Sequence, residues 1–144
     1  MMSLSVISPA FENNNRLPIK YTCDGQGINP PLMIENIPSD AKSLVLIVED
    51  PDAPSGTFDH WIVWNIPPKE RIEEDSTPGV VGRNSGGRST YFSPCPPWGT
   101  HRYIFRVYAL DSRIELQSGS RRRELEKAIQ SHIVAKGELV GLYR

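Results

Sequence analysis

Titratable side chains gather in two polar, proline-rich segments, and each segment adjoins an apolar run. The first segment covers residues 50–65 and the second covers residues 91–103. Together they contain two carboxylates and two histidines: Asp50, Asp52, His60 and His101. Imidazole titrates at about pH 6.5, so paired histidines offer donors to an anion near neutral pH. Loops anchored by rigid strands are the usual place for binding chemistry, and we therefore expect a binding site here.

Four kinds of site are compatible with these residues. In the first, the histidines and the backbone N–H groups of the Ser93–Gly99 loop form a pocket for an anion or phosphomonoester. In the second, the aspartates and histidines hold zinc or a harder metal, although their spacing matches no HExxH or EF-hand motif. In the third, Ser55 or Ser93 is a nucleophile beside a histidine, without a G-x-S-x-G elbow. In the fourth, the polar groups only close turns and satisfy buried hydrogen bonds.

The four side chains meet only if strands carry them to one place. Apolar, β-branched runs bounded by Pro, Gly, Asn and Asp predict strands at Leu4–Ile7, Ile19–Thr22, Leu32–Ile34, Leu44–Val48, Trp61–Ile66, Tyr103–Leu110 and Leu139–Tyr143. The Leu44–Val48 run is apolar throughout, which is typical of a central strand. If its two neighbours run antiparallel to it, Asp50, Asp52, His60 and His101 converge at one rim. The sharp turn between Asp50 and His60 favours a cis Ala53–Pro54 peptide bond.

One segment has helical rather than strand-like periodicity. Its apolar positions recur at helical spacing, at Leu125, Ala128, Ile129, His132 and Ile133. The pattern predicts a helix at Arg121–Lys136, with Ser120 as its N-cap and Gly137 ending it in a left-handed conformation. His132 is expected to pack and hydrogen-bond on the apolar face. The basic run Arg121–Arg123 is expected to be the solvated start of the helix.

Composition restricts the class of protein. A chain of 144 residues with a formal net charge of -1 suits one domain, covering residues 1–144, and gives no electrostatic reason to bind nucleic acid or an anionic membrane. The N-terminus lacks a basic region and an apolar stretch of signal-peptide type, and no apolar run approaches the roughly 20 residues of a membrane span. We therefore expect a cytoplasmic protein. Cys23 and Cys95 are either two reduced thiols or a pair that joins two loops.

The same segments carry a resemblance to a known family. The motifs Asp50-Pro-Asp-Ala-Pro54, His60-Trp-Ile-Val-Trp-Asn-Ile-Pro67, Pro94-Cys-Pro-Pro97 and Gly99-Thr-His-Arg-Tyr103 resemble the signature regions of the phosphatidylethanolamine-binding proteins, which include the Raf kinase inhibitor proteins. Tyr21-Thr-Cys-Asp-Gly25 and Pro30-Pro31 are similar to the bacterial and archaeal branch. The resemblance extends over nearly the whole chain.

The resemblance implies a mainly β fold, an antiparallel β-sandwich with a Greek-key element and one long helix near the C-terminus. It also implies a small cavity for phosphate-like anions and phosphorylated head groups, without a metal or cofactor. The matching positions are Asp50, Asp52, His60, Tyr91, Pro94, Pro96 and His101. Ser93 stands where the family usually has glycine, and its side chain is expected to narrow the pocket mouth or add a hydroxyl to it.

The family implies binding and inhibition rather than turnover, so we expect no enzyme. For a member of the bacterial and archaeal type, the expectation is a serine protease inhibitor with an anion pocket. The alternative is a regulator of signalling proteins that binds a phospholipid head group or another phosphorylated ligand and inhibits no protease. Trp98, in the proline loop, either contacts a partner or packs on the sandwich. A homodimer is left open.

Overall fold

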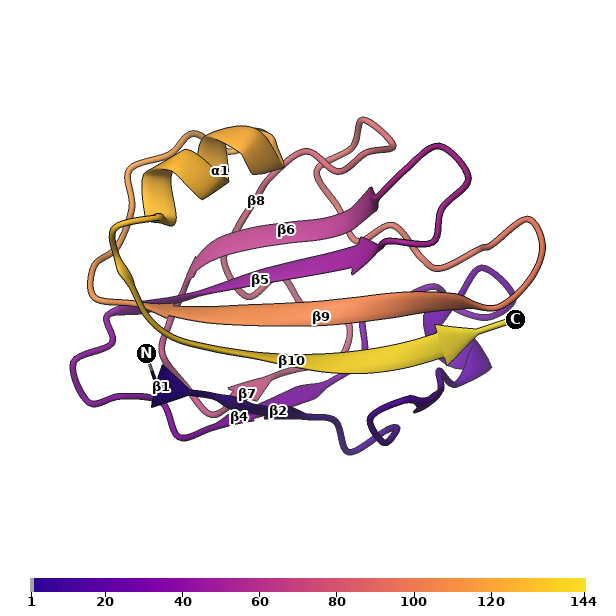
Figure 1. The fold of residues 1–144 in the computed structure, drawn as a ribbon, viewed down its shortest axis with the longest axis horizontal. Helices are drawn as coiled ribbons and strands as arrows, with labels where there is room; N and C mark the ends of the chain where they lie inside the picture. The colour runs from indigo at the N-terminus through magenta and orange to yellow at the C-terminus, as the bar shows by residue number, and fades with distance from the viewer. Residues whose placement is uncertain (1) are drawn as a thin grey trace.

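Two β-sheets and one α-helix form the computed structural model, which describes residues 2–144 (Figure 1). The larger sheet has the strand order β1-β10-β9-β5-β6-β8, with β3 beside β10. Its strands are β1 (Met2–Ser3), β3 (Asn15–Arg16), β5 (Ser43–Asp50), β6 (Phe58–Ile66), β8 (Val80–Val81), β9 (His101–Leu110) and β10 (Ile133–Tyr143). The smaller sheet consists of β2 (Ser5–Ile7), β4 (Leu32–Glu35) and β7 (Arg71–Ile72). The predicted mainly β sandwich is confirmed.

The larger sheet contains a Greek key. β5 pairs with β6, β6 with β8, and the long connection after β8 returns the chain so that β9 pairs with β5 on its other side. All three pairings are antiparallel, and the spatial order β9-β5-β6-β8 is the order that defines the motif. β5 therefore lies at the centre of the sheet, as its uninterrupted apolar sequence predicts.

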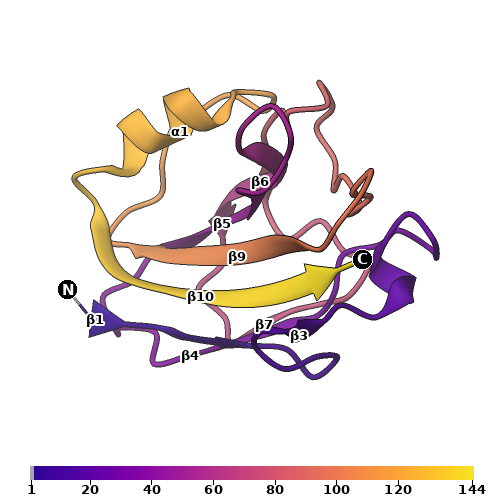
Figure 2. The same ribbon diagram turned by 45° about the vertical axis from the view of Figure 1, so that its right-hand side comes forward.

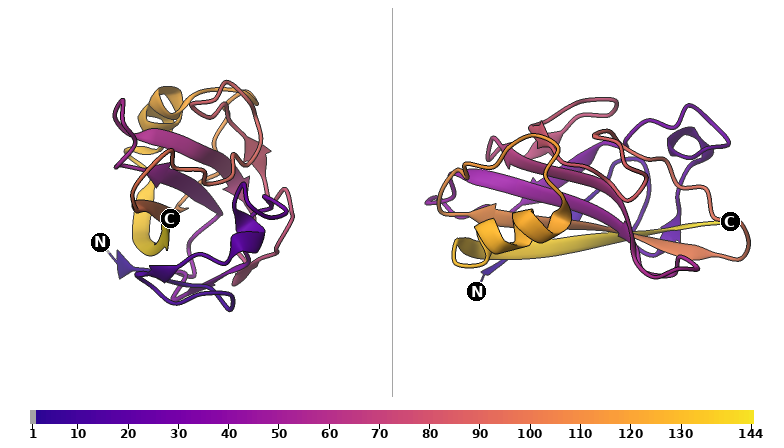
Figure 3. Two further views of the ribbon diagram at one scale, coloured as in Figure 1. Left: turned by 90° about the vertical axis from the view of Figure 1, so that its right-hand side faces the viewer. Right: turned by 90° about the horizontal axis from the view of Figure 1, so that it is seen from above.

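Both faces of the larger sheet are covered. Side chains alternate between the faces of a strand, and in β5 Leu44, Leu46 and Val48 face the smaller sheet while Val45 and Ile47 face the helix. Figure 3 shows the helix on one side of the large sheet and the short strands on the other. Burying a large apolar side chain contributes about 1.5 to 3 kcal/mol, so these two layers hold β5 and its neighbours rigidly.

The helix is shorter than the sequence pattern predicts. α1 covers Arg122–Ile129, Arg121 rather than Ser120 is its N-cap, and residues 133–143 form β10 instead of its last turns. The spacing of four between Ile129 and Ile133 fits a helix, but it also fits two periods of a strand. Pairing of β10 with β9 decided the outcome. His132 lies in the turn between α1 and β10, partly exposed, with Nδ1 2.9 Å from Asp111 Oδ1.

The predicted strand Ile19–Thr22 is wrong as well. Ile19–Tyr21 forms a short 3-10 helix, η1, whose hydrogen bonds run from Tyr21 N to Pro18 O and from Thr22 N to Ile19 O. Pro18 fixes its own φ angle and starts the turn, while the Thr22 hydroxyl donates to Ile19 O. Figure 2 shows η1 beside the C-terminal end of β10. Within residues 2–144, no helix combines the length and the apolar character that a membrane span requires.

Candidate functional site

Three of the predicted polar residues lie at one end of the large sheet. Asp50 is the last residue of β5 and His101 is the first residue of β9. His60 is the third residue of β6, inside the strand rather than before it. Because β5 runs antiparallel to both β6 and β9, the end of β5 meets the starts of its two neighbours. The predicted convergence therefore holds for Asp50, His60 and His101, but not for Asp52, which is absent from the cavity lining.

The connection between Asp50 and His60 turns without a cis peptide bond. The Ala53–Pro54 bond is trans, so the prediction of a cis bond is wrong. Gly56 completes the reversal instead: its N–H donates to Ala53 O at 3.1 Å, and its φ of 104° is one that residues with a Cβ rarely adopt.

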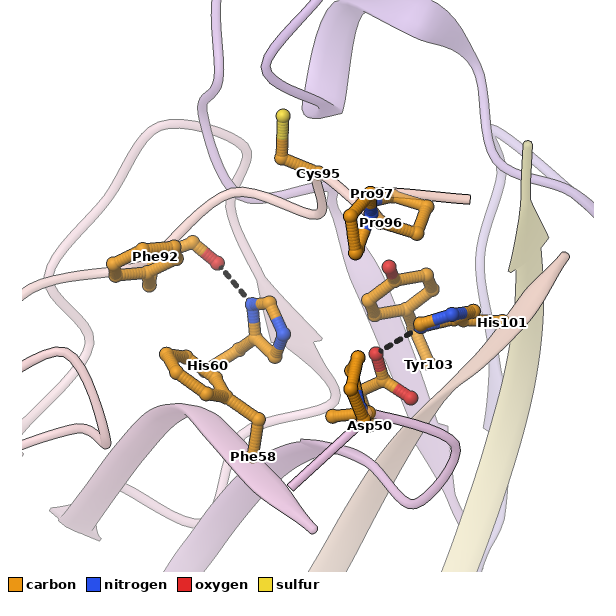
Figure 4. A pocket seen from close by; sticks show the side chains of 11 residues that line it. Asp50, Phe58, His60, Phe92, Cys95, Pro96, Pro97, His101 and Tyr103 are labelled. Atoms are coloured by element: carbon orange, nitrogen blue, oxygen red, sulfur yellow. Dashed lines mark hydrogen bonds and ion pairs between the residues drawn. The ribbon is translucent and has the colours of Figure 1, made fainter. Parts of the chain in front are cut away.

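A cavity of about 180 Å³ opens where these strand ends meet. Asp50, His60, His101 and the hydroxyl of Tyr103 supply its polar side-chain groups, and the remaining walls are largely apolar. The full lining is Asp50, Ala53, Pro54, Phe58, His60, Phe92, Cys95, Pro96, Pro97, His101 and Tyr103. Figure 4 shows the two imidazole rings on either side of the Tyr103 ring, with Asp50 between the strands and Pro96 and Pro97 opposite.

Asp50 orients His101. The Asp50 side chain is almost fully buried, and its Oδ2 lies 2.7 Å from His101 Nδ1. Its other oxygen accepts the backbone N–H of Asp52 at 2.8 Å. Both carboxylate oxygens are thus engaged as acceptors, so Nδ1 of His101 carries a proton and Nε2 is left for a ligand.

A backbone carbonyl orients His60 through the same ring atom, Nδ1. Its Nδ1 lies 2.6 Å from Phe92 O, which accepts only, so Nδ1 donates and Nε2 faces the cavity (Figure 4). Burial lowers the pKa of His60 below its ordinary value of 6.5, and the charge of His101 adds to this. The bond to Phe92 O and the carboxylates of Asp50 and Asp59 oppose the shift. Near neutral pH His60 is therefore mostly neutral, with a lone pair on Nε2.

Three predicted site residues lie outside the lining of this cavity. Asp52 points away and binds Arg102 through both carboxylate oxygens, at 2.8 and 2.9 Å, and these hydrogen bonds lower its pKa to about 2. Tyr91 packs edge-on against Trp61 and donates its hydroxyl to Tyr21 O at 3.0 Å. Pro94 is buried but does not line the cavity.

Ser93 also lies away from the cavity. A Cβ at Gly27 would lie 3.4 Å from its Oγ, which places the Ser93 side chain against that loop. The expectation that Ser93 narrows the mouth is therefore wrong. The structure instead adds Phe58, Phe92 and Tyr103 to the lining.

Two of these additional residues had a signal in the sequence. Phe58 precedes His60 by two residues and Tyr103 follows His101 by two, so each pair shares one face of its strand. Their rings pack around His60, with centroids 4.8 Å from Phe58 and 5.3 Å from Tyr103. Phe92 had no such signal, because its part in the site depends on a loop carbonyl that only the fold brings to His60.

The cysteines form a disulfide bond, which decides between the two alternatives. Cys23 and Cys95 have Cα atoms 5.4 Å apart, and the bond ties the loop after η1 to the Pro94–Trp98 wall. Trp98 stands beyond this tie with 68% of its surface exposed, so it does not pack on the sandwich. Among residues 2–144, no three His, Cys, Asp or Glu side chains are grouped closely enough to hold a metal ion.

Comparison with known proteins places the chain in a family. Residues 7–144 match the family model described as phosphatidylethanolamine-binding protein. A UPF0098 protein of Pyrococcus horikoshii is 53% identical over 99% of this chain and 77% of its own length. The crystal structure of a phosphatidylethanolamine-binding protein homologue from Chlamydia trachomatis superposes with a TM-score of 0.96 at 41% identity, covering 100% of this chain and 99% of that one. E. coli YbcL, described as a member of the mammalian family, gives a TM-score of 0.89 at 27% identity over 99% and 98% of the two chains. This chain therefore belongs to the phosphatidylethanolamine-binding protein family.

Proposed function

We propose that the cavity binds a phosphate-like anion, as the free ion or as the phosphomonoester of a small head group. One observation carries the proposal: two imidazoles are held by their Nδ1 atoms so that both are left with Nε2 for a ligand in the same cavity. Phe58, Phe92 and Pro97 supply an apolar wall for a short organic substituent. Phe92 and Pro97 are exposed, so this wall reaches the protein surface.

Which anions bind depends on whether the anion or His60 Nε2 carries a proton that the two can share. A bare anion meets the buried carboxylate of Asp50 and, near neutral pH, the lone pair of His60 Nε2, and both repel it. A monoprotonated phosphate brings its own proton for Nε2, whereas sulfate brings none. Sulfate therefore needs His60 to be protonated, and its binding reports the charge of that ring.

We expect sulfate affinity to fall as pH rises. Bound sulfate favours the imidazolium form of His60, so binding above the pKa of the free protein takes up a proton, and affinity drops by about tenfold per pH unit. The pKa is lowered, so this decline begins below about pH 6.5. Titration calorimetry between about pH 5 and pH 8 measures it, and the affinity for phosphoethanolamine is expected to begin its decline at higher pH, because below its second pKa of about 6 the phosphate brings its own proton to Nε2.

His60→Gln is the matched control for this titration. The glutamine amide can reach toward the position of Nε2 but does not titrate, so the pH dependence of sulfate binding should become shallower. Sulfate affinity that is independent of pH in the wild type, or that depends on pH equally in both proteins, contradicts the role given to His60.

We propose binding without turnover for this cavity. Its lining within the described chain contains no serine, threonine or lysine, and its cysteine is in a disulfide bond. Aliphatic hydroxyl, thiol and amine nucleophiles are therefore not in place, and we infer that the aspartate, histidines and tyrosine of the lining bind the anion without attacking it. Incubation with phosphoethanolamine or a chromogenic phosphomonoester should release no product.

A second proposed function is inhibition of a serine protease by the proline loop. The observation that favours it is Trp98, an exposed tryptophan in a loop that prolines and a disulfide restrain. Restraint lowers the entropy that the loop loses when a protease cleft immobilises it. Tryptophan is also among the residues that most often dominate interface energies.

Trp98→Ala should weaken inhibition of a chymotrypsin- or elastase-type protease by about 30-fold or more, the loss expected for a hot-spot side chain. Met2→Ala is the matched control, because Met2 is also an exposed hydrophobic residue, 57% exposed, but lies on the edge strand β1. Inhibition constants for wild type and both variants test this. No inhibition across a protease panel, with anion binding intact, favours the alternative of a head-group-binding regulator without protease inhibition.

A further inference from the structure

The outer wall of the cavity is held by its disulfide bond, by the buried rings of Pro94 and Pro96, and by few hydrogen bonds. Residues 93–100 have no regular secondary structure and join the anchored Phe92 to the start of β9. In the described part of the chain, two hydrogen bonds tie this stretch to the rest, from Cys23 N to Pro94 O at 3.1 Å and from Arg144 Nη1 to Pro96 O at 3.4 Å. The disulfide bond is the covalent tie, and Cys95, Pro96 and Pro97 line the cavity.

The far side of the disulfide bond is itself fixed to the sheet. Asp24, next to Cys23, accepts hydrogen bonds from the Tyr143 hydroxyl and the Arg144 guanidinium at the end of β10. Cys23 thus provides a rigid anchor, and the bond transmits that rigidity to Cys95. The inner wall has other supports: Phe92 and His60 exchange two hydrogen bonds, from Phe92 N to His60 O and from His60 Nδ1 to Phe92 O.

Both cysteines are exposed to solvent. Disulfide bonds that are exposed have higher reduction potentials and are more often the labile or regulatory ones. A thiolate from solution can therefore approach this part of the wall. The bond is thus formed by two exposed residues, and one of them, Cys95, lines the cavity.

We propose that the Cys23–Cys95 bond is a redox switch for the anion cavity, an inference that rests on the proposed function of that cavity. A dithiol reductant attacks one sulfur through its thiolate and forms a mixed disulfide, and its second thiolate then displaces the protein sulfur. Two electrons pass to the protein, Cys23 and Cys95 leave as thiols after taking up protons, and the reductant becomes a disulfide. The reduced wall is mobile and the cavity loses its preformed shape, while the sandwich core remains folded.

The expected effect is a loss of affinity on reduction. Fixing the backbone of one residue is worth a factor of about five to thirty in an equilibrium constant, so releasing even part of the wall should weaken phosphoethanolamine binding by about tenfold or more. The affinity is measured for the oxidised protein, for the protein reduced with dithiothreitol, and after reoxidation. Mass spectrometry after alkylation of free thiols establishes the redox state of each sample.

Two variants separate the effect of the disulfide bond from other effects of the reductant. Cys23→Ser removes it without changing the cavity lining and should bind as weakly as the reduced wild type, whether or not dithiothreitol is present. Ser93→Ala, in the same wall but outside the bond, should keep the full redox response. Equal affinity of oxidised and reduced wild type, or a bond that resists dithiothreitol in the folded protein, overturns the proposal.

Hydrogen exchange of the Cys23 amide, which donates to Pro94 O at 3.1 Å, separates this proposal from the function on which it rests. If the oxidised protein binds neither phosphoethanolamine nor phosphate, the anion-binding function fails. The switch is then tested on the tie between the two loops: faster exchange of the Cys23 amide on reduction, with the amides of the sheet strands unchanged, supports it, and unchanged exchange overturns it.

Discussion

Replacing Gly137 with alanine is expected to lower the free energy of unfolding by about 3 kcal/mol, and the melting temperature by about 10 °C. A Cβ at this position would lie 2.3 Å from Leu4 O, a backbone atom that cannot move aside as a side chain can. Leu4 N donates to Lys136 O at 2.8 Å, so the N-terminal segment is bonded directly to β10 at this point. The methyl group therefore forces apart the parallel pairing of β1 with β10.

Thermal and urea unfolding of Gly137→Ala measure this loss. Lys136→Ala is the matched control, since Lys136 is the adjacent exposed residue of β10 and its backbone hydrogen bond survives the substitution. That control should change stability by less than about 0.5 kcal/mol. If both variants are equally stable, the approach of Leu4 to Gly137 does not constrain the fold.

Neutralising Glu49 is expected to destabilise the protein by about 2 to 3 kcal/mol. Glu49 has 5% of its surface exposed, and one carboxylate oxygen is shared by two guanidinium groups, 2.9 Å from Arg106 Nε and 3.0 Å from Arg122 Nη2. Arg122 also binds Asp59 at 2.8 Å. These ion pairs join β5, β6 and β9 to α1 in a partly buried layer. Glu49→Gln removes the charge and leaves both guanidinium groups less well compensated.

Denaturant unfolding of Glu49→Gln, compared with Glu126→Gln, tests the role of burial. Glu126 also faces Arg122, at 3.5 Å, but its side chain is 58% exposed. An exposed pair contributes about 0 to 1 kcal/mol because water and salt screen it, so this control should be nearly neutral. Similar losses in the two variants contradict the view that burial gives Glu49 its importance.

The ion pairs of Arg122 could not be predicted from the basic run at Arg121–Arg123. A cluster of arginines before an apolar helix predicts a solvated helix start, and Arg121 and Arg123 are exposed as expected. Arg122 is turned toward the sheet, where Glu49 and Asp59 neutralise it. Neither carboxylate is near Arg122 in sequence, so no local pattern indicates the pairing.

Much of the architecture could be predicted because strand alternation and apolar runs are local properties. The continuous apolar run at Leu44–Val48 predicts a strand that is buried on both faces, and β5 is that strand. Strand polarity then places Asp50 and His101 at one rim, because antiparallel neighbours must begin where the central strand ends. The motifs around His60 and Pro94–Pro97 indicate the family, which the comparisons confirm.

Tertiary structure decided the features that depend on contacts between distant residues. Ile133 fits both a helix and a strand by spacing, and pairing with β9 made the segment a strand. Asp52 and Tyr91 belong to the right loops, but Arg102 and Trp61 hold them away from the cavity. The pairing of Cys23 with Cys95 across 72 residues was likewise open until the loops met. Local propensity indicates most of the strands, whereas pairing between strands decided the ambiguous segments, and the shape of the cavity depends on which loops the folded sheets bring together.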